Sequence, residues 1–224
     1  MKIIKASERF HTKLDWLDSY HCFSFGDHYD PKKMNHGDLV VINDDIIEPS
    51  SGFGKHSHQN MDIVSWPLEG ELTHQDSMGS KEKIDFGHVQ YMPAGSGVTH
   101  SEFNDHPTKQ CRLVQMWVKP SEENIDPIYS SKKIPATELE GFVNIIPNQI
   151  QINNQHAQLF WFALSEDDEA VELPHCNYAW LYVTNGTAQV KGEKLEAGDS
   201  LKVDSDDPKK VNFSGKFNAL LWTF

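Results

Sequence analysis

The chain has 224 residues, of which 20 are lysine or arginine and 33 are aspartate or glutamate, so its formal net charge at pH 7 is −13. This length accommodates one large β domain or two small ones, with ample core in either case. Because so acidic a chain repels a phosphate backbone, we expect no direct binding to nucleic acid.

The opening stretch and the cysteines bear on the cellular compartment. The stretch MKIIKASERFHTKLDWLDS has no apolar core of signal-peptide length, and no run elsewhere approaches a membrane span. Cys22, Cys111 and Cys176 are odd in number, lie far apart and form no CxxC pair, so we expect reduced thiols in the core. We therefore expect a cytoplasmic protein that does not associate with membranes.

The first half of the chain carries short runs rich in β-branched and aromatic residues, bounded by Gly, Pro and Asn. A turn at Glu69-Gly70 joins two of these runs and predicts an antiparallel pair. The predicted strands are 22–25, 39–47, 61–68, 71–75, 88–92, 99–103 and 113–118.

The β-strand pattern of the sequence stops after Pro120. A stretch with three further prolines predicts a connection at 121–147 with one helical turn at 136–139. The β pattern then resumes, and Asn185-Gly186 predicts a hairpin turn. The predicted strands are 158–164, 179–183, 187–190, 200–203 and 217–222. No long helical periodicity occurs, so we expect an all-β chain with domains at 1–120 and 148–224.

Two pairs of polar residues stand beside glycine-rich turns, His56 with His58 in GFGKHSHQN and His100 with Glu102 in GVTHSEF. Side chains alternate between the faces of a strand, so the two members of each pair point to the same side. Three imidazoles and one carboxylate that converge on a point would form a ligand set for a divalent transition metal. The alternative is four polar residues on the solvated face of a sheet.

Other polar and apolar residues of this half receive simpler interpretations. We expect each of three further histidines to be exposed or to support a ligand by a hydrogen bond: His74, His88 and His106. Five large side chains suit a barrel core, and some of them could line an aromatic pocket: Met61, Trp66, Tyr91, Met92 and Phe103.

The two halves also resemble each other. A turn at Gly70 precedes a strand that begins near Gly87, and a turn at Gly186 precedes one that begins near Gly198. This predicts a duplicated barrel.

When Gly87 is laid on Gly198, Val211 falls opposite His100 and Phe213 opposite Glu102. The second half also lacks a His-x-His pair and offers only His175, with an asparagine two residues later. We therefore expect a second barrel that has lost its ligands.

The sequence of the first 120 residues resembles that of the pirin family, whose members are bicupins. The motifs that carry the resemblance are FSFGDHYDP, VINDD, GFGKHSHQNMDIVSW, LEGELTHQDSMG and HVQYMPAGSGVTHSEFN. The resemblance implies two antiparallel β-barrels and one metal ion per chain, usually iron, in the N-terminal barrel, with manganese, nickel, copper and zinc as alternatives. It implies His56, His58, His100 and Glu102 as the ligands.

The resemblance also implies a quercetin 2,3-dioxygenase, which opens the central ring of a flavonol with O2 and releases CO. Its partners would be a small aromatic substrate and O2, and we expect a monomer. Glu102, which can accept a proton, is the candidate general base as well as a ligand. The alternative function is a metal-containing redox or ligand sensor, without catalysis, that binds a protein partner. Neither a nucleotide-binding glycine fingerprint nor a nucleophile elbow occurs, which argues against hydride and acyl transfer.

Overall fold

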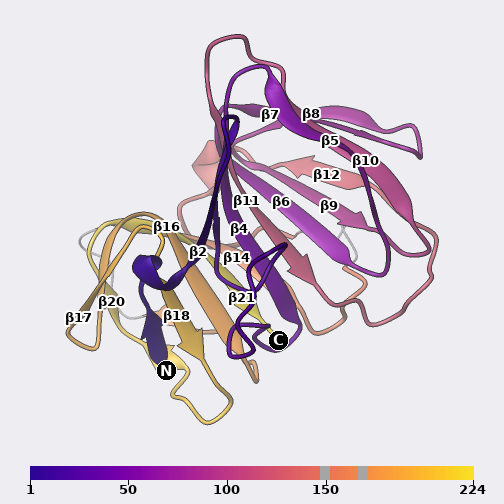
Figure 1. Cartoon of the computed structure of the whole chain (residues 1–224). Helices are drawn as coiled ribbons and strands as arrows, with labels where there is room; N and C mark the ends of the chain where they lie inside the picture. Colours follow the sequence, from indigo (N-terminus) through magenta and orange to yellow (C-terminus); the bar gives the residue numbers. More distant parts are fainter. Residues whose placement is uncertain (147–151, 166–170) are drawn as a thin grey trace. The chain divides into compact units, whose positions relative to one another are not determined.

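The computed structural model describes residues 1–146, 152–165 and 171–224 (Figure 1). These residues form β-strands and two short 3-10 helices, Ala6–Glu8 and Ala136–Glu138. Every strand pair among them is antiparallel, which confirms the predicted all-β class. The second helix is the helical turn predicted at 136–139. No helix among the described residues is long and apolar enough to cross a membrane.

The described residues divide into two compact units. The N-terminal unit contains residues 10–134 and 152–155, and the C-terminal unit contains residues 1–9, 135–146, 156–165 and 171–224. This division differs from the predicted domains because the first strand of the chain, β1 (Lys2–Ile4), pairs with β18 (Ser200–Val203).

The described part of the predicted connection at 121–147 holds two strands that join different units. β12 (Ser130–Lys133) pairs with β9 (His88–Pro93) in the N-terminal unit. β13 (Gly141–Asn144) pairs with β14 (Gln158–Leu164) in the C-terminal unit. The predicted connection therefore contributes one strand to a sheet of each unit.

Residues 152–155 belong to the N-terminal unit because buried groups of its strands bind them. The backbone N–H of Asn153 donates to the Tyr91 hydroxyl at 2.6 Å, and that of Asn154 donates to Asp62 Oδ2 at 3.2 Å. Burial raises the pKa of Asp62 to about 6.

The N-terminal unit consists of two sheets. The larger has the order β12-β9-β6-β11-β4-β3-β2 and the smaller the order β5-β10-β7-β8. The bounds not yet given are β2 (Phe10–Lys13), β3 (Leu17–His21), β4 (Leu39–Ile47), β5 (Ser51–His58), β6 (Asp62–Glu69), β7 (Glu71–Asp76), β8 (Lys81–Asp85), β10 (Val98–Asn104) and β11 (Cys111–Val118).

Apolar side chains from both sheets of this unit meet in a shared core. Leu72 and Ile84 of the smaller sheet pack with Ile47 and Leu113 of the larger one, and all four are buried. Burial of each such side chain contributes roughly 1.5–3 kcal/mol. Phe53 of β5 also packs against this core, which holds the smaller sheet against the larger one.

The predicted pairing of the runs at 61–68 and 71–75 is wrong. β6 pairs with β9 and β11, whereas β7 pairs with β8 and β10 in the other sheet. The chain changes sheets at Gly70, which has a φ of +73°. A Cβ there would lie 2.5 Å from the carbonyl oxygen of Gln110, so a close backbone approach requires glycine.

The chain makes a similar change of sheet in the C-terminal unit, at Gly186. β16 (Ala179–Val190) runs through Asn185 and Gly186, so the predicted hairpin turn at these residues is wrong. The register with β21 (Phe217–Thr223) shifts between Val183 and Asn185, and Gly186 has a φ of +82°. Beyond Gly186 the strand pairs with β17 (Glu193–Glu196) and β20 (Phe213–Ser214), as β7 pairs with β8 and β10.

Strand register gives the same correspondence between the halves as the alignment of Gly87 with Gly198. In the first half Glu102 pairs with His74, four residues after Gly70. In the second half Phe213 pairs with Val190, four residues after Gly186.

Apolar packing fills the C-terminal unit at the matching positions. Val190, Val211 and Phe213 lie in its buried apolar core, and His175 is exposed. A short pair, β15 (Val171–Glu172) with β19 (Lys210–Val211), completes the described strands.

The beginning of the chain departs most from prediction. The predicted strand at 22–25 is wrong, because β3 ends at His21 and the chain then enters a loop. β1, β2 and β3 were not predicted. β2 and β3 are short and largely polar, so neither carries a strong strand signal.

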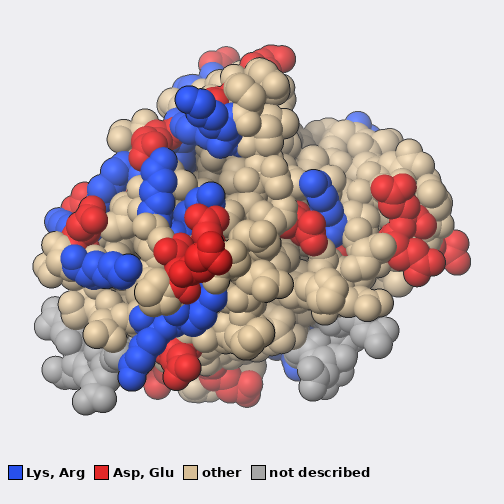
Figure 2. Space-filling model, turned by 90° about the horizontal axis from the view of Figure 1, so that it is seen from below, with Lys and Arg blue, Asp and Glu red and all other residues tan. Residues whose placement is uncertain are grey.

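Figure 2 shows the charged side chains on one face. Lysine and arginine lie beside aspartate and glutamate there and do not form one continuous area.

The corner at Gly70 yields a stability prediction. We expect Gly70→Ala to lower the free energy of unfolding by more than about 2 kcal/mol, because the left-handed conformation alone costs roughly 1–2 kcal/mol and the Cβ also meets backbone. Denaturant unfolding measures the change. Gly54→Ala is the matched control, since a Cβ there meets nothing within 4 Å. Equal stability of the two variants would contradict the prediction.

Candidate metal centre

The pairing of β5 with β10 brings the predicted ligands together. His56 stands directly opposite His100, and His58 stands opposite Val98. The register then shifts, so that Glu102 stands opposite Phe53 and β5 has one extra residue. Such a bulge re-aims the residues on either side of it. Phe53 and His56, three residues apart, consequently both line one cavity.

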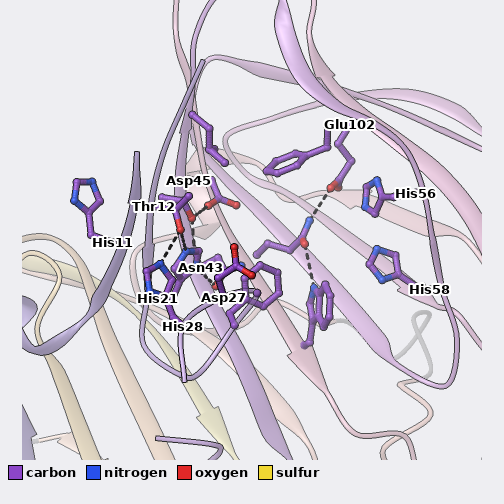
Figure 3. Close-up of a pocket in the computed structure, with 17 residues that line it drawn as sticks. His11, Thr12, His21, Asp27, His28, Asn43, Asp45, His56, His58 and Glu102 are labelled. Carbon is purple, nitrogen blue, oxygen red and sulfur yellow. Dashed lines mark hydrogen bonds between the residues drawn. The ribbon is translucent and has the colours of Figure 1, made fainter. Parts of the chain in front are cut away.

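Three imidazoles form a compact cluster. The ring centroids lie 4.4 Å apart for His56 and His100, 4.8 Å for His56 and His58, and 4.9 Å for His58 and His100. One nitrogen of each ring lies within 4.8 Å of the others. Glu102 lies on the same face of β10 as His100 and groups with His100 and His74, and Figure 3 shows it beside His56 and His58.

The buried atoms of this cluster fit a divalent metal ion. His58 Nε2, His100 Nε2 and Glu102 Oε1 are all buried without a hydrogen-bond partner. His56 Nδ1 lies 2.8 Å from the carbonyl oxygen of Gly54 and must donate to it, which leaves the lone pair on Nε2. Unpaired buried acceptors are costly, and a bound cation would satisfy them together.

A chain of hydrogen bonds orients His100. His74 Nε2 lies 3.0 Å from Asp76 Oδ2 and donates to it, so His74 Nδ1 is an acceptor. His100 Nδ1 lies 3.4 Å from that atom and donates to it, which directs the lone pair of His100 Nε2 into the cluster. Backbone N–H groups of Met78 and Ser80 hold Asp76 Oδ1.

His74 also lies close enough to His100 and Glu102 to be considered a ligand. Both of its ring nitrogens are engaged, however, and the Tyr129 ring stacks on it with centroids 4.5 Å apart. His74 therefore supports His100 by a hydrogen bond, which is one of the two roles predicted for it. His88 and His106 lie away from the cluster, where they bind Asp85 and the backbone of a neighbouring loop.

A second chain of hydrogen bonds orients Glu102. Gln115 Nε2 donates to Glu102 Oε2 at 2.8 Å, and Trp117 Nε1 donates to Gln115 Oε1 at 3.0 Å. The indole therefore fixes the direction of the amide, which leaves Glu102 Oε1 for a metal. The same indole packs edge-on against His58, with centroids 4.9 Å apart.

Burial keeps His58 and His100 neutral at pH 7. It lowers the pKa of His58 to about 4 and that of His100 to about 3, and the neighbouring imidazoles add to the effect. Neutral rings retain the lone pair with which they would bind a metal ion.

Two family descriptions match the chain. Pirin matches residues 4–118, and the quercetinase C-terminal cupin domain matches residues 147–222. The chain belongs to the pirin family. A protein of Escherichia coli K12 named quercetin 2,3-dioxygenase is 36% identical over 97% of this chain and 96% of its own length.

Solved structures of a pirin agree with the fold. YhhW from Escherichia coli is 34% identical and superimposes with a TM-score of 0.91 over 100% of this chain and 97% of its own. The same pirin in complex with nickel(II) is 33% identical, with a TM-score of 0.90 over 100% of this chain and 98% of its own. The match over both halves confirms the bicupin fold.

In this chain, the candidate ligands border a cavity of about 520 Å³ within the N-terminal unit. Figure 3 shows His56, His58 and Glu102 on one side of it. The other side is polar and comes from β2, β3 and β4, with Thr12, Ser19, His21, Asn43 and Asp45. The apolar lining consists of Leu17, Phe25, Phe53 and Trp117.

The aromatic residues of the cavity differ from the expected ones. None of Met61, Trp66, Tyr91, Met92 and Phe103 lines it. Trp66, Tyr91 and Met92 are buried, whereas Phe103 is exposed and its assignment to the core is wrong. Gln115 and Trp117, which sequence analysis did not assign to the site, have the same i, i+2 spacing as the ligands, and that spacing is the signal that could have found them.

The ligand cluster predicts a metal stoichiometry. We expect the purified protein to hold close to one transition-metal ion per chain, and His56→Ala or His100→Ala to abolish binding. Elemental analysis of folded protein measures both. His106→Ala and His175→Ala are the controls and should retain the ion. Two ions per chain, or full binding in the His56 and His100 variants, would contradict the ligand assignment.

The polar wall of the cavity predicts a pH-dependent stability. Burial raises the pKa of Asp45 from 3.8 to about 7, so the folded protein loses stability as the pH rises from about 4 to about 7. Asp45→Asn removes this loss. We therefore expect the variant to have a Tm similar to that of the wild type at pH 4 and several degrees higher at pH 8. Thermal unfolding at matched metal content tests this, and a lower Tm at pH 8 would refute it.

Proposed function

We propose that the chain is a metal-dependent dioxygenase that opens the central ring of a flavonol such as quercetin with O2 and releases CO. The observation that carries the proposal is the set of three imidazoles and one carboxylate at the edge of an aromatic-lined cavity, in which His58, His100 and Glu102 each have a buried acceptor atom without a hydrogen-bond partner. The name of the Escherichia coli relative, quercetin 2,3-dioxygenase, supports it.

His56, His58, His100 and Glu102 would hold one divalent ion. Iron is our assignment, and the nickel(II) complex of the Escherichia coli pirin shows that a related protein takes another divalent metal. A bound ion supplies Lewis acidity, which lowers the pKa of a hydroxyl group that it contacts. The side chains themselves contribute three imidazole nitrogens and one carboxylate oxygen as donors.

The remaining lining residues suit a flat aromatic substrate. Phe25 and Trp117 meet edge to face, with centroids 5.4 Å apart, and Phe53 stands across from Glu102 on the neighbouring strand. A cavity of about 520 Å³ is in the range that holds a small organic ligand. Aromatic walls bind a ring by apolar contact and exclude water from the reacting atoms.

The fused rings of a flavonol carry hydroxyl groups, and the cavity offers partners for them. His21 Nδ1 lies 2.8 Å from Asn43 Oδ1, and Thr12 Oγ1 lies 2.9 Å and 3.0 Å from ring nitrogens of His21 and His28. These groups can exchange hydrogen bonds with a ligand because their own network lines the cavity. We infer that they orient the substrate toward the ligand cluster.

Turnover of quercetin tests the proposal. We expect its long-wavelength absorbance to disappear only when O2 and metal are both present, with release of CO. If the protein is loaded in turn with iron, manganese, nickel and copper and consumes no flavonol, the enzyme assignment is wrong. The sensor that binds a protein partner would then become the leading hypothesis. Location in the cytoplasm and a monomeric state stay predictions.

Glu102→Gln separates the two roles predicted for Glu102. The amide is nearly isosteric and can still coordinate through oxygen, but it is a very weak proton acceptor. Loss of turnover with metal retained would support the base role, and loss of metal and turnover together would support the ligand role alone.

A further inference from the structure

The cavity contains a second buried carboxyl group, which the ligand cluster does not use. Asp45 is 3% exposed and lines the cavity from β4. Side chains alternate along β4, so Asn43 and Asp45 face the cavity and Asp44 faces away from it. Asp44 forms two hydrogen bonds with Arg112, at 2.9 Å and 2.7 Å. Of the two adjacent aspartates, the one that faces away from the cavity is therefore paired with a cation.

Asp45 has no such cation. Among the described residues no lysine or arginine forms an ion pair with it, and its hydrogen-bond donor is the Ser19 hydroxyl on β3, which binds Oδ1. This arrangement leaves Oδ2 for a ligand in the cavity. An unpaired buried carboxylate costs stability, and a barrel without a function at this place would be more stable with an apolar or amide side chain.

The surroundings of Asp45 explain its ionisation. Its pKa is raised to about 7, chiefly by burial and to a smaller extent by the carboxylates of Asp44 and Glu102, whereas the Ser19 hydroxyl acts to lower it. Cys111 on β11 lies near the same groups, and its own raised pKa of about 12 keeps it a neutral thiol. A group that titrates near pH 7 can both take and release a proton under neutral conditions.

Glu102 is less free to accept a proton. Its Oε2 accepts a hydrogen bond from Gln115, and its Oε1 belongs to the ligand cluster. Figure 3 shows Asp45 and Glu102 on opposite sides of the same cavity. A ring system that occupies the cavity therefore lies between a ligand carboxylate and a carboxyl group with an uncommitted oxygen.

We propose that Asp45 is the group that accepts the hydroxyl proton of the aromatic substrate, with Ser19 holding its carboxylate in place. The O–H bond of the substrate breaks, a new O–H bond forms at Asp45 Oδ2, and the electron pair stays on the substrate oxygen as a phenolate. The step needs no oxidant. This inference rests on the proposed function for its substrate class.

The test compares Asp45→Asn with the wild type and with Asp44→Asn, which changes the neighbouring side chain on the opposite face of β4. At equal metal content we expect Asp45→Asn to lower kcat for quercetin at least about 100-fold, the usual size of a lost general base. Asp44→Asn should stay within a few-fold of the wild type. Unchanged kcat in Asp45→Asn would overturn the proposal.

Ser19→Ala supplies a graded readout that a purely structural role would not give. Loss of the Ser19 hydroxyl destabilises the carboxylate form, so the acidic limb of the kcat/KM profile should move to higher pH while the maximal rate stays close to that of the wild type. A profile that keeps its position would contradict the role of Asp45.

A binding experiment keeps the inference separate from the dioxygenase proposal. Quercetin is added under anaerobic conditions to metal-free protein, and the red-shifted absorbance of its anion is recorded from pH 6 to pH 9. We expect the anion to form at lower pH on the wild type than on Asp45→Asn, whether or not any turnover occurs. Identical titrations of the two proteins, or no binding by either, would overturn the inference even if the loaded enzyme is active.

Discussion

The antiparallel pairing of β5 with β10 is the constraint on which the site depends. It sets His56 opposite His100, and the extra residue of β5 then turns Phe53 toward the same cavity as His56. A shift of one residue in this register would move every side chain of one strand to the other face. Phe53 of β5 packs against the core that Leu72 and Ile84 form with the larger sheet, and this contact opposes such a shift.

Two chains of hydrogen bonds aim the donor atoms before any ion is present. One runs from Asp76 through His74 to His100, and the other runs from Trp117 through Gln115 to Glu102. The C-terminal unit has apolar residues at the corresponding strand positions. Val190 and Phe213 occupy the positions of His74 and Glu102 there, and they pack into an apolar core.

The all-β fold and the four candidate ligands were predictable from the sequence, because i, i+2 spacing on a strand determines which side chains share a face. The change of sheet at Gly70 and Gly186 was not, since local turn signals do not reveal which strand will be the partner. Nor was the place of Asp45, because the two adjacent aspartates of VINDD differ only in the direction in which the strand presents them. Phe25 could not be assigned to the cavity, because only the folding of the loop after β3 brings it there.

The pairing of Lys2 with Lys202 has a consequence for the order in which the protein is assembled on the ribosome. The first strand leaves the exit tunnel long before its partner strand is synthesised, and the N-terminal unit can fold in the interval. Contacts between residues so distant in sequence form late, because closing a long loop costs entropy before any contact compensates for it. The first strand therefore waits as an unpaired edge, and the lysines at its two ends, Lys2 and Lys5, provide the charge that discourages pairing with other nascent chains.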